Sequence, residues 1–187
     1  SPGQLSKTLS GFDKLGWTVR HGSKRGSGAW RTPSDTLGVM LESWASHVAG
    51  QALPTRTLHA ISRDMTSRVI SALREADISG SWALTGLAAA NLYAPLATSV
   101  GTVEVALEDR QFDSNAFWAL MEQQGNRISG AGGAIRMVRV ESRVLGRGEV
   151  RDGTPVVSAP RVYAGLKAGG GRASEIADGL REVAIGV

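Results

Sequence analysis

The first 32 residues constrain the fold more than any other stretch, because they have the pattern of one amphipathic helix followed by a hairpin. Ser1 is a favourable N-cap, and Pro2 suits the first helical position because its missing N–H would be unpaired there anyway. Gln4, three residues after Ser1, completes an S-x-x-Q capping box. The sequence therefore predicts a helix that begins at Ser1-Pro2 and ends at Gly16.

The two faces of this predicted helix differ in chemical character. Its apolar residues recur at helical spacing and form a single stripe, which consists of Leu5, Leu9, Phe12 and Leu15. The opposite face is small, polar and basic, and it consists of Gly3, Gln4, Lys7, Ser10 and Lys14. A helix that enters the major groove of DNA presents such a face, so we predict that these five residues bind DNA.

Residues 17–32 have the pattern of a hairpin. Residues 17–20 alternate apolar and polar side chains, residues 22–28 form a basic, glycine-rich tip, and residues 29–32 return. Helix, strand, basic loop and strand follow one another as in the second half of a winged helix-turn-helix. We therefore predict a partial winged helix-turn-helix over residues 1–34. In its wing, His21, Lys24 and Arg25 are expected to contact phosphates or a minor groove.

Charge favours a nucleic-acid partner over an ordinary solvated surface. Residues 1–31 hold six Lys and Arg against one Asp, a net charge of +5. The rest of the chain holds 15 basic and 16 acidic residues, so the overall charge of +4 comes entirely from the N-terminal part. Such a concentration of positive charge is the usual signature of phosphate contact.

The predicted recognition helix lacks the helices that would precede it. A helix-turn-helix uses earlier helices to hold the recognition helix against the groove, and this chain starts at the cap of that helix. We therefore expect the native gene to encode about 60–100 further residues before Ser1, which would complete a domain of ordinary size.

Composition limits the class of protein. An apolar content of 42% and five Trp are enough for a packed core in 187 residues. The absence of Cys excludes disulfides and thiolate metal sites. No apolar run approaches the roughly 18 residues of a membrane span, so we expect a cytoplasmic protein with no membrane partner.

After the hairpin, a bridging helix is predicted within residues 35–50, and a mixed domain over residues 51–187. The strands predicted in that domain are residues 56–62, 82–84, 100–107, 135–140, 144–145 and 155–157. The predicted helices are residues 65–76, 87–93, 114–124, 160–168 and 173–183. Helices interleaved with strands predict an α+β or α/β fold class for this domain.

Two of these elements carry specific expectations about burial. In the strand at residues 100–107, we expect Val103, Val105 and Leu107 to be buried, and the opposite face with Thr102, Glu104 and Ala106 to be wet. In the last helix, Ile176, Leu180 and Val183 share one side and are expected to pack on the core.

Four stretches of the chain together resemble the antitoxin family of type IV (abortive-infection) toxin–antitoxin systems. They are SPGQLSKTLSGFDKLGW, WALTGLAAANLYAP, VVSAPRVYAGLKAGGGRASEIADGLRE and the ending REVAIGV. Residues 111–148 match least. The resemblance implies an N-terminal winged helix that binds operator DNA of its own operon and represses it. It further implies a C-terminal α/β domain that counters a cognate nucleotidyltransferase-like toxin.

Catalytic patterns are absent from the sequence. The three histidines, His21, His47 and His59, are not at metal-ligand spacing, and no G-x-S-x-G elbow occurs. The glycine-rich segments 130–134 and 169–172 lack the Lys-Ser or Lys-Thr of a phosphate-binding loop. We therefore predict no catalytic residue, no metal and no cofactor.

Two other functions stay open. Thr85-Gly86, a helix and the strand at residues 100–107 resemble the layout of nucleotidyltransferase domains, which hold magnesium on a D-x-D pair. Here Val103 and Val105 occupy the positions of that pair, and the neighbouring carboxylates are Glu104, Glu108 and Asp109. A nucleotidyltransferase-fold enzyme is thus one alternative, and a protein-interaction module with a merely solvated basic helix is the other.

Overall fold

The structure, a computed structural model, describes residues 2–16, 18–21, 30–33, 37–129 and 133–186. The chain divides into two compact units, Ser1–Trp44 and Ala45–Gly186, and each is described by itself. Helix α2 (Leu37–Ala49) contributes residues to both units.

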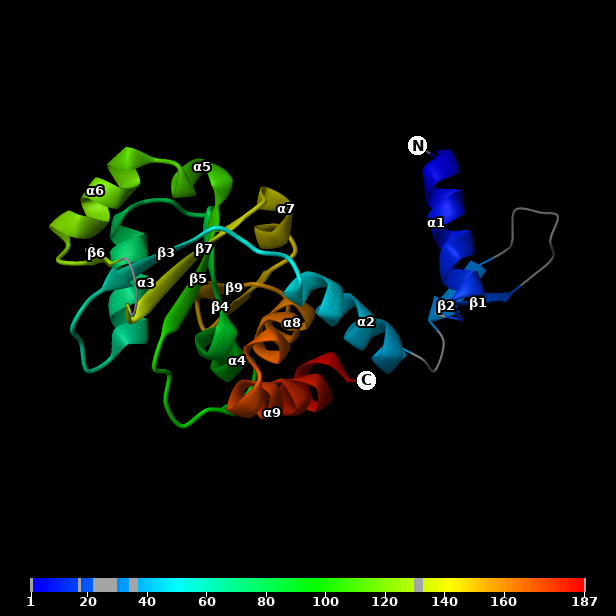
Figure 1. Cartoon of the computed structure of the whole chain (residues 1–187). Coiled ribbons are helices and arrows are strands. Elements are labelled where there is room, and N and C mark those ends of the chain that lie inside the picture. Colours follow the sequence, from blue (N-terminus) through cyan, green and yellow to red (C-terminus); the bar gives the residue numbers. More distant parts are fainter. Residues whose placement is uncertain (1, 17, 22–29, 34–36, 130–132, 187) are drawn as a thin grey trace. The chain divides into compact units, whose positions relative to one another are not determined.

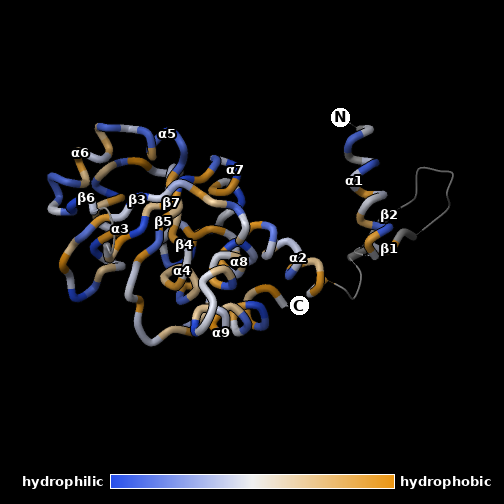
Figure 2. Tube along the Cα trace, viewed as in Figure 1, coloured by the Kyte–Doolittle hydropathy of each residue, from blue (hydrophilic) through white to orange (hydrophobic). Residues whose placement is uncertain are grey.

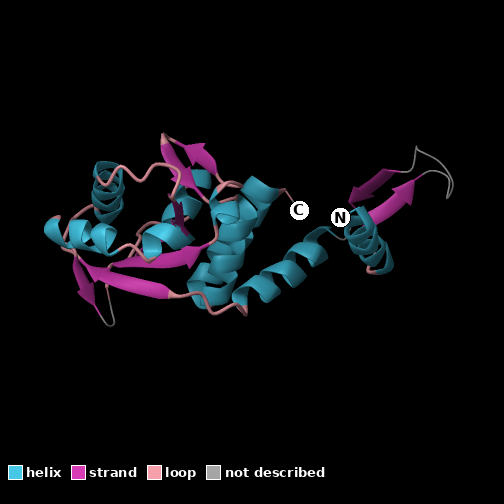
Figure 3. Cartoon of the chain, turned by 90° about the horizontal axis from the view of Figure 1, so that it is seen from above, coloured by secondary structure: helices cyan, strands magenta, loops and turns pink. Residues whose placement is uncertain are grey.

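The first unit contains the predicted helix and hairpin. Helix α1 (Pro2–Lys14) is followed by the antiparallel strands β1 (Thr18–His21) and β2 (Trp30–Pro33). The hairpin lies beside α1 (Figure 3). Gly16 comes directly after the end of α1 and has φ +71°, a left-handed conformation that glycine adopts without a steric penalty. The order of elements predicted for this stretch is therefore confirmed.

The expected apolar stripe of α1 is only partly right. Leu9 and Phe12 are half-buried, but Leu15 is 62% exposed. The helix ends at Lys14, and Leu15 lies in the turn between the helix and Gly16. The side chain of Leu5 and the capping residue Ser1 lie outside the described part of the structure.

The second unit is built on one mixed sheet of seven strands with the order β6-β3-β7-β5-β4-β9-β8 (Figure 1). Its strands are β3 (Thr55–His59), β4 (Trp82–Thr85), β5 (Val103–Glu108), β6 (Arg127–Ser129), β7 (Ile135–Val140), β8 (Glu149–Arg151) and β9 (Thr154–Val156). Strands β5 and β7 pair in parallel, as do β4 and β9, and the other neighbours pair antiparallel. The predicted mixed α/β class is thereby confirmed.

Helices cover both faces of this sheet. They are α3 (Met65–Glu75), α4 (Gly86–Tyr93), α5 (Asp109–Phe112), α6 (Asn115–Gln123), α7 (Ser142–Leu145), α8 (Ala159–Gly169) and α9 (Gly171–Leu180). Helices α3, α5 and α6 lie on one face, whereas α4, α8 and α9 pack together on the other. Apolar residues concentrate on the central strands β4, β5 and β7 (Figure 2).

Strand β5 shows why the sheet needs two helical layers. Val103, Val105 and Leu107 are fully buried on one of its faces, as the sequence predicts. The expectation of a wet opposite face is wrong, because Ala106 is buried there as well and Glu104 is mostly covered. Alternation along a strand indicates which side chains are polar. Whether they are exposed to water depends on the helices that pack on that face of the sheet.

Aromatic residues of α5 and α6 form the core on the face of the sheet that α3, α5 and α6 cover. The Trp118 indole Nε1–H donates a hydrogen bond to the backbone carbonyl of Phe112 at 2.7 Å, and both rings are buried. The guanidinium of Arg56 on β3 lies 4.7 Å from the Trp118 ring centroid, a cation–π contact. These contacts tie the helical layer to the sheet.

Several element boundaries differ from the prediction. The strand expected at 56–62 ends at His59, and the strand expected at Val144-Leu145 is instead part of the short helix α7. Strands β6 and β8 were not expected, because three residues are too few to show a periodic pattern. Val183 is 65% exposed and does not pack on the core, because α9 ends at Leu180 and a π-helical turn follows at Arg181–Ile185.

Gly133, in the glycine-rich segment 130–134, is needed for close packing. A Cβ on Gly133 would collide with the backbone of Leu58 on the neighbouring strand β3. This glycine therefore serves strand packing, and residues 130–132 lie outside the described residues. Of the helices in the described ranges, none is both long and apolar enough to cross a membrane.

Candidate functional site

The polar face predicted on α1 is exposed in the structure. All five of its residues, Gly3, Gln4, Lys7, Ser10 and Lys14, are exposed. No acidic residue occurs in the first turn of α1, and its only acidic residue, Asp13, is half-buried. The Thr18 hydroxyl donates to a carboxylate oxygen of Asp13 at 2.6 Å, so this acid joins the helix to strand β1. The exposed face of α1 is therefore free of negative side chains.

The hairpin carries the other predicted DNA-binding residues. Its register pairs Arg20 with Arg31 and His21 with Trp30, which places two basic residues at one position of the ladder. His21 is the last residue of β1 and its side chain is not described, and Lys24 and Arg25 lie outside the described residues. For the basic residues of the two strands, the structure therefore describes the pairing of the backbone and not the positions of the side chains.

The second unit contains a cavity of about 260 Å³ on the sheet face that α8 covers. Its floor includes Glu104 of β5 and Arg136 of β7, whose Oε1 and Nη2 atoms form an ion pair at 2.9 Å. Gly86, which has φ +61° at the start of α4, packs against the same carboxylate. The carboxylate of Glu104 is therefore engaged by Arg136 and covered from the side of α4.

One wall of the cavity is a face of α8. Arg161, Ala164, Gly165 and Ala168 recur at helical spacing along it. A Cβ on Gly165 would meet no atom within 4 Å, so the small residues of this face leave open space. The other lining residues include the aliphatic side chains of Leu53, Val138, Val140, Val144 and Val157.

Arg161 is the half-buried cation of this cavity. Its guanidinium has no hydrogen bond or ion pair within the part of the chain that the structure describes. Burial lowers the pKa of Arg161, because the charged form loses hydration and gains no opposite charge. Sequence reasoning missed this residue, although an arginine one residue after the start of a predicted helix is in an unusual position for a cation.

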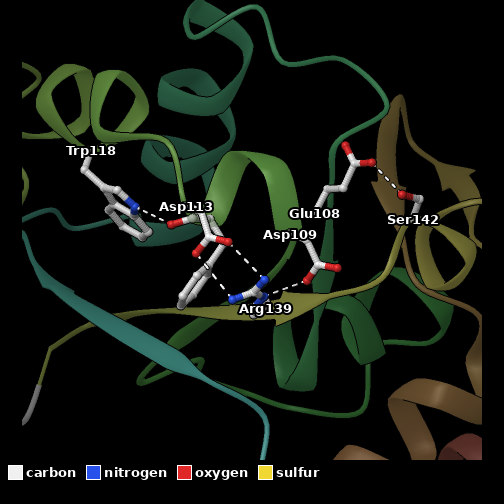
Figure 4. Close-up of polar contacts among 7 residues, drawn as sticks. Glu108, Asp109, Asp113, Trp118, Arg139 and Ser142 are labelled. Atoms are coloured by element: carbon white, nitrogen blue, oxygen red, sulfur yellow. Dashed lines mark hydrogen bonds and ion pairs between the residues drawn. The ribbon is translucent and has the colours of Figure 1, made fainter.

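A polar cluster lies where β5 and β7 end side by side (Figure 4). Glu108, the last residue of β5, accepts hydrogen bonds from Ser142 Oγ at 2.5 Å and from Ser81 Oγ at 3.0 Å. These bonds, that of Ser142 first, hold the pKa of the Glu108 carboxyl below its usual range. Arg139 lies between Asp109 and Asp113, at 2.7 and 3.0 Å from their carboxylate oxygens. Its pKa is raised, chiefly by the hydrogen bond with Asp109.

These contacts bear on the nucleotidyltransferase alternative. Each carboxylate near the predicted strand has a protein partner: Arg136 for Glu104, Ser142 and Ser81 for Glu108, and Arg139 for Asp109. Within the described ranges, no group of three or more His, Asp or Glu side chains could hold a metal ion. The carboxylates at this edge of the sheet are therefore engaged in contacts within the protein.

Comparison of the chain with models of protein families, with curated proteins and with solved structures found no match.

Proposed function

We propose that this protein is a DNA-binding transcriptional regulator whose first unit is the recognition helix and wing of a winged helix-turn-helix. The observation that carries the proposal is the exposed polar face of α1, in which Lys7 and Lys14 flank Ser10 without an acidic neighbour on that face. Residues of such a helix can reach base edges in the major groove, and a basic hairpin beside it can contact phosphates.

Electrostatics supports the same function. The net charge of +5 is confined to residues 1–31, so an approaching polyanion is attracted to the first unit and not to the chain as a whole. Arg20 and Arg31 are paired in the backbone register of the hairpin, so both strands of the hairpin contribute a basic residue. We assign DNA contact to Gly3, Gln4, Lys7, Ser10, Lys14, His21, Lys24 and Arg25.

We further propose that the regulator is a type IV antitoxin that represses its own operon and counters a nucleotidyltransferase-like toxin. This part of the proposal rests on the resemblance of the four sequence stretches to that family. In this role the protein has no catalytic activity of its own, and the engaged carboxylates of Glu104, Glu108 and Asp109 support that view.

The test of DNA binding compares two duplexes, one from immediately upstream of the protein's own operon and one of scrambled sequence. Fluorescence anisotropy gives Kd for both. We expect Lys7→Ala to weaken binding to the upstream duplex by roughly 1–3 kcal/mol and to leave binding to the scrambled duplex nearly unchanged. Arg63→Ala, which removes an exposed arginine of the second unit, is the matched control and should change neither value.

Two results would contradict the proposal. If the protein shows no salt-dependent affinity for either duplex, the basic face is only solvated and the protein-interaction module is the better description. For the antitoxin role, we expect the adjacent nucleotidyltransferase-like gene to inhibit the growth of the host cells that express it. Co-expression of this protein should restore their growth. A locus without such a gene would remove the support for that role.

A further inference from the structure

The cavity under α8 is lined mostly by aliphatic residues, and among the described residues it contains one unpaired charge, the guanidinium of Arg161. Of the three charged residues in its lining, Glu104 and Arg136 neutralise one another, so Arg161 leaves a net charge of about +1. The polar residues Gln51, Thr55 and Thr85 also line the cavity. A ligand that fits this lining therefore carries one negative charge and an apolar body.

The position of Arg161 is unfavourable for folding in three respects. It lies in the first turn of α8, where the partial positive charge of the helix end repels a cation. It is half-buried, and its guanidinium has no carboxylate or carbonyl partner among the described residues. Residues that break local rules of stability without compensation are concentrated at functional sites. A bound anion would compensate all three costs at once.

The shape and chemistry of the walls restrict the rest of the ligand. A cavity of about 260 Å³ lies slightly below the usual range of roughly 300–1,000 Å³ for small-molecule sites, so the ligand is small. The described lining contains no aromatic side chain on which a base could stack, and Val138, Val140 and Val157 offer branched aliphatic contacts. These features favour a short branched acid over a nucleotide.

We propose that this cavity binds a small aliphatic carboxylate, whose acidic group pairs with Arg161 and whose hydrocarbon part lies against the valines of the sheet. The site lies entirely within the second unit and is independent of the proposed DNA interface. Ala164, Gly165 and Ala168 act as spacing residues, because larger side chains on this face of α8 would fill the cavity.

The experiment titrates the whole protein with 3-methylbutanoate and 4-methylpentanoate by isothermal titration calorimetry. Their uncharged amides and inorganic phosphate serve as comparison ligands. We expect saturable binding of the carboxylates with Kd in the millimolar range or tighter. The amides should bind at least about tenfold more weakly, because they lack the charge that pairs with Arg161. Phosphate alone should also bind weakly, because it lacks the hydrocarbon part.

Two variants separate ligand recognition from folding. Arg161→Gln should raise Kd for the carboxylates at least about tenfold, whereas Arg63→Gln, at an exposed arginine away from the cavity lining, should leave Kd unchanged. Gly165→Leu fills the open space and replaces a helical glycine, so it should abolish binding while the protein unfolds at an equal or higher temperature.

Other outcomes overturn the proposal. Absence of carboxylate binding to the unmodified protein does so, as does equal binding of the amides. Unchanged affinity in both cavity variants would place the ligand elsewhere. Binding of phosphate alone, sensitive to Arg161→Gln, would show an anion site without the aliphatic recognition proposed here. None of these outcomes changes the test of DNA binding, which uses other residues.

Discussion

Glu104 on β5 and Arg136 on β7 lie directly opposite one another in a parallel pair of strands and form an ion pair at 2.9 Å. The Glu104 side chain is 25% exposed and that of Arg136 is 47% exposed, so the pair lies at the edge of the solvent. Gly86 packs against the same carboxylate from the start of α4. The pair therefore connects the two central parallel strands with the beginning of a buried helix.

Replacement of Gly86 should be costly. A Cβ at this residue would lie 2.9 Å from Cδ of Glu104, and φ +61° is unfavourable for any residue with a side chain. We expect Gly86→Ala to lower the free energy of unfolding by about 1–3 kcal/mol. Urea denaturation followed by circular dichroism measures the change.

Two further variants test the reason for that loss. In a Glu104→Ala background, Gly86→Ala should cost less, because the contact with the carboxylate is gone while the backbone strain persists. Gly165→Ala is the matched control: it lies within α8 with open space around it and should stabilise by about 0.5–1 kcal/mol. A Gly86→Ala protein as stable as the parent would contradict the role of this glycine.

Glu108 should make stability depend on acidity. Its pKa is lower in the folded protein than in the unfolded chain, because Ser142 and Ser81 donate hydrogen bonds to the carboxylate. Its contribution is therefore complete above the ordinary pKa near 4.5 and is lost as the pH falls through the lower, folded-state pKa. Ser142→Ala should raise the pKa of Glu108 and reduce this acid-dependent loss of stability.

Carboxyl NMR titration and urea midpoints at a series of acidic pH values measure both effects. Ser46→Ala, at an exposed serine of α2, should leave the pKa of Glu108 unchanged. If Ser142→Ala also leaves that pKa unchanged, the hydrogen bond between the two side chains does not form in solution.

Trp118 should be essential for the layer formed by α5 and α6. Trp118→Phe removes the donor to the Phe112 carbonyl, leaves a small void, and weakens the contact with Arg56. Together these losses should lower the free energy of unfolding by roughly 2–4 kcal/mol. Guanidinium denaturation measures the change, and a loss below about 0.5 kcal/mol would show that the aromatic layer is not well packed.

The hairpin tip should contribute affinity for DNA without sequence preference. Lys24→Ala/Arg25→Ala should weaken binding to all duplexes alike, and each lost phosphate contact should reduce the slope of log K against log salt by about 0.9. Anisotropy titrations at several salt concentrations measure the slope. A selective loss on the upstream duplex would instead assign base recognition to the tip.

The protein should not catalyse nucleotidyl transfer. Val103 and Val105 are fully buried at the positions where paired carboxylates would hold magnesium, and Glu104 is engaged by Arg136. Incubation with magnesium, labelled nucleoside triphosphates and RNA should give no incorporation above a buffer control. Incorporation that Glu104→Ala abolishes would make the protein an enzyme and refute this prediction.

The sequence alone determined those features that depend on neighbours along the chain. Helical spacing and Gly16 predicted α1 and its end, and the separation of charge marked residues 1–31 as the basic part. Alternation predicted Val103, Val105 and Leu107 as the buried face of β5. Each of these inferences needs only the period of a regular element or the identity of a turn residue.

Only the tertiary structure decided which distant residues meet. The parallel pairing that places Glu104 opposite Arg136, the burial of Ala106, and the cavity around Arg161 arise from segments far apart in the chain. Short strands such as β6 and β8 form because a neighbouring strand supplies hydrogen-bond partners, and three residues have no periodicity of their own. Burial and cavities are properties of packed layers. A pattern of polarity along the sequence indicates which residues tend to be buried but does not identify the residues that they contact.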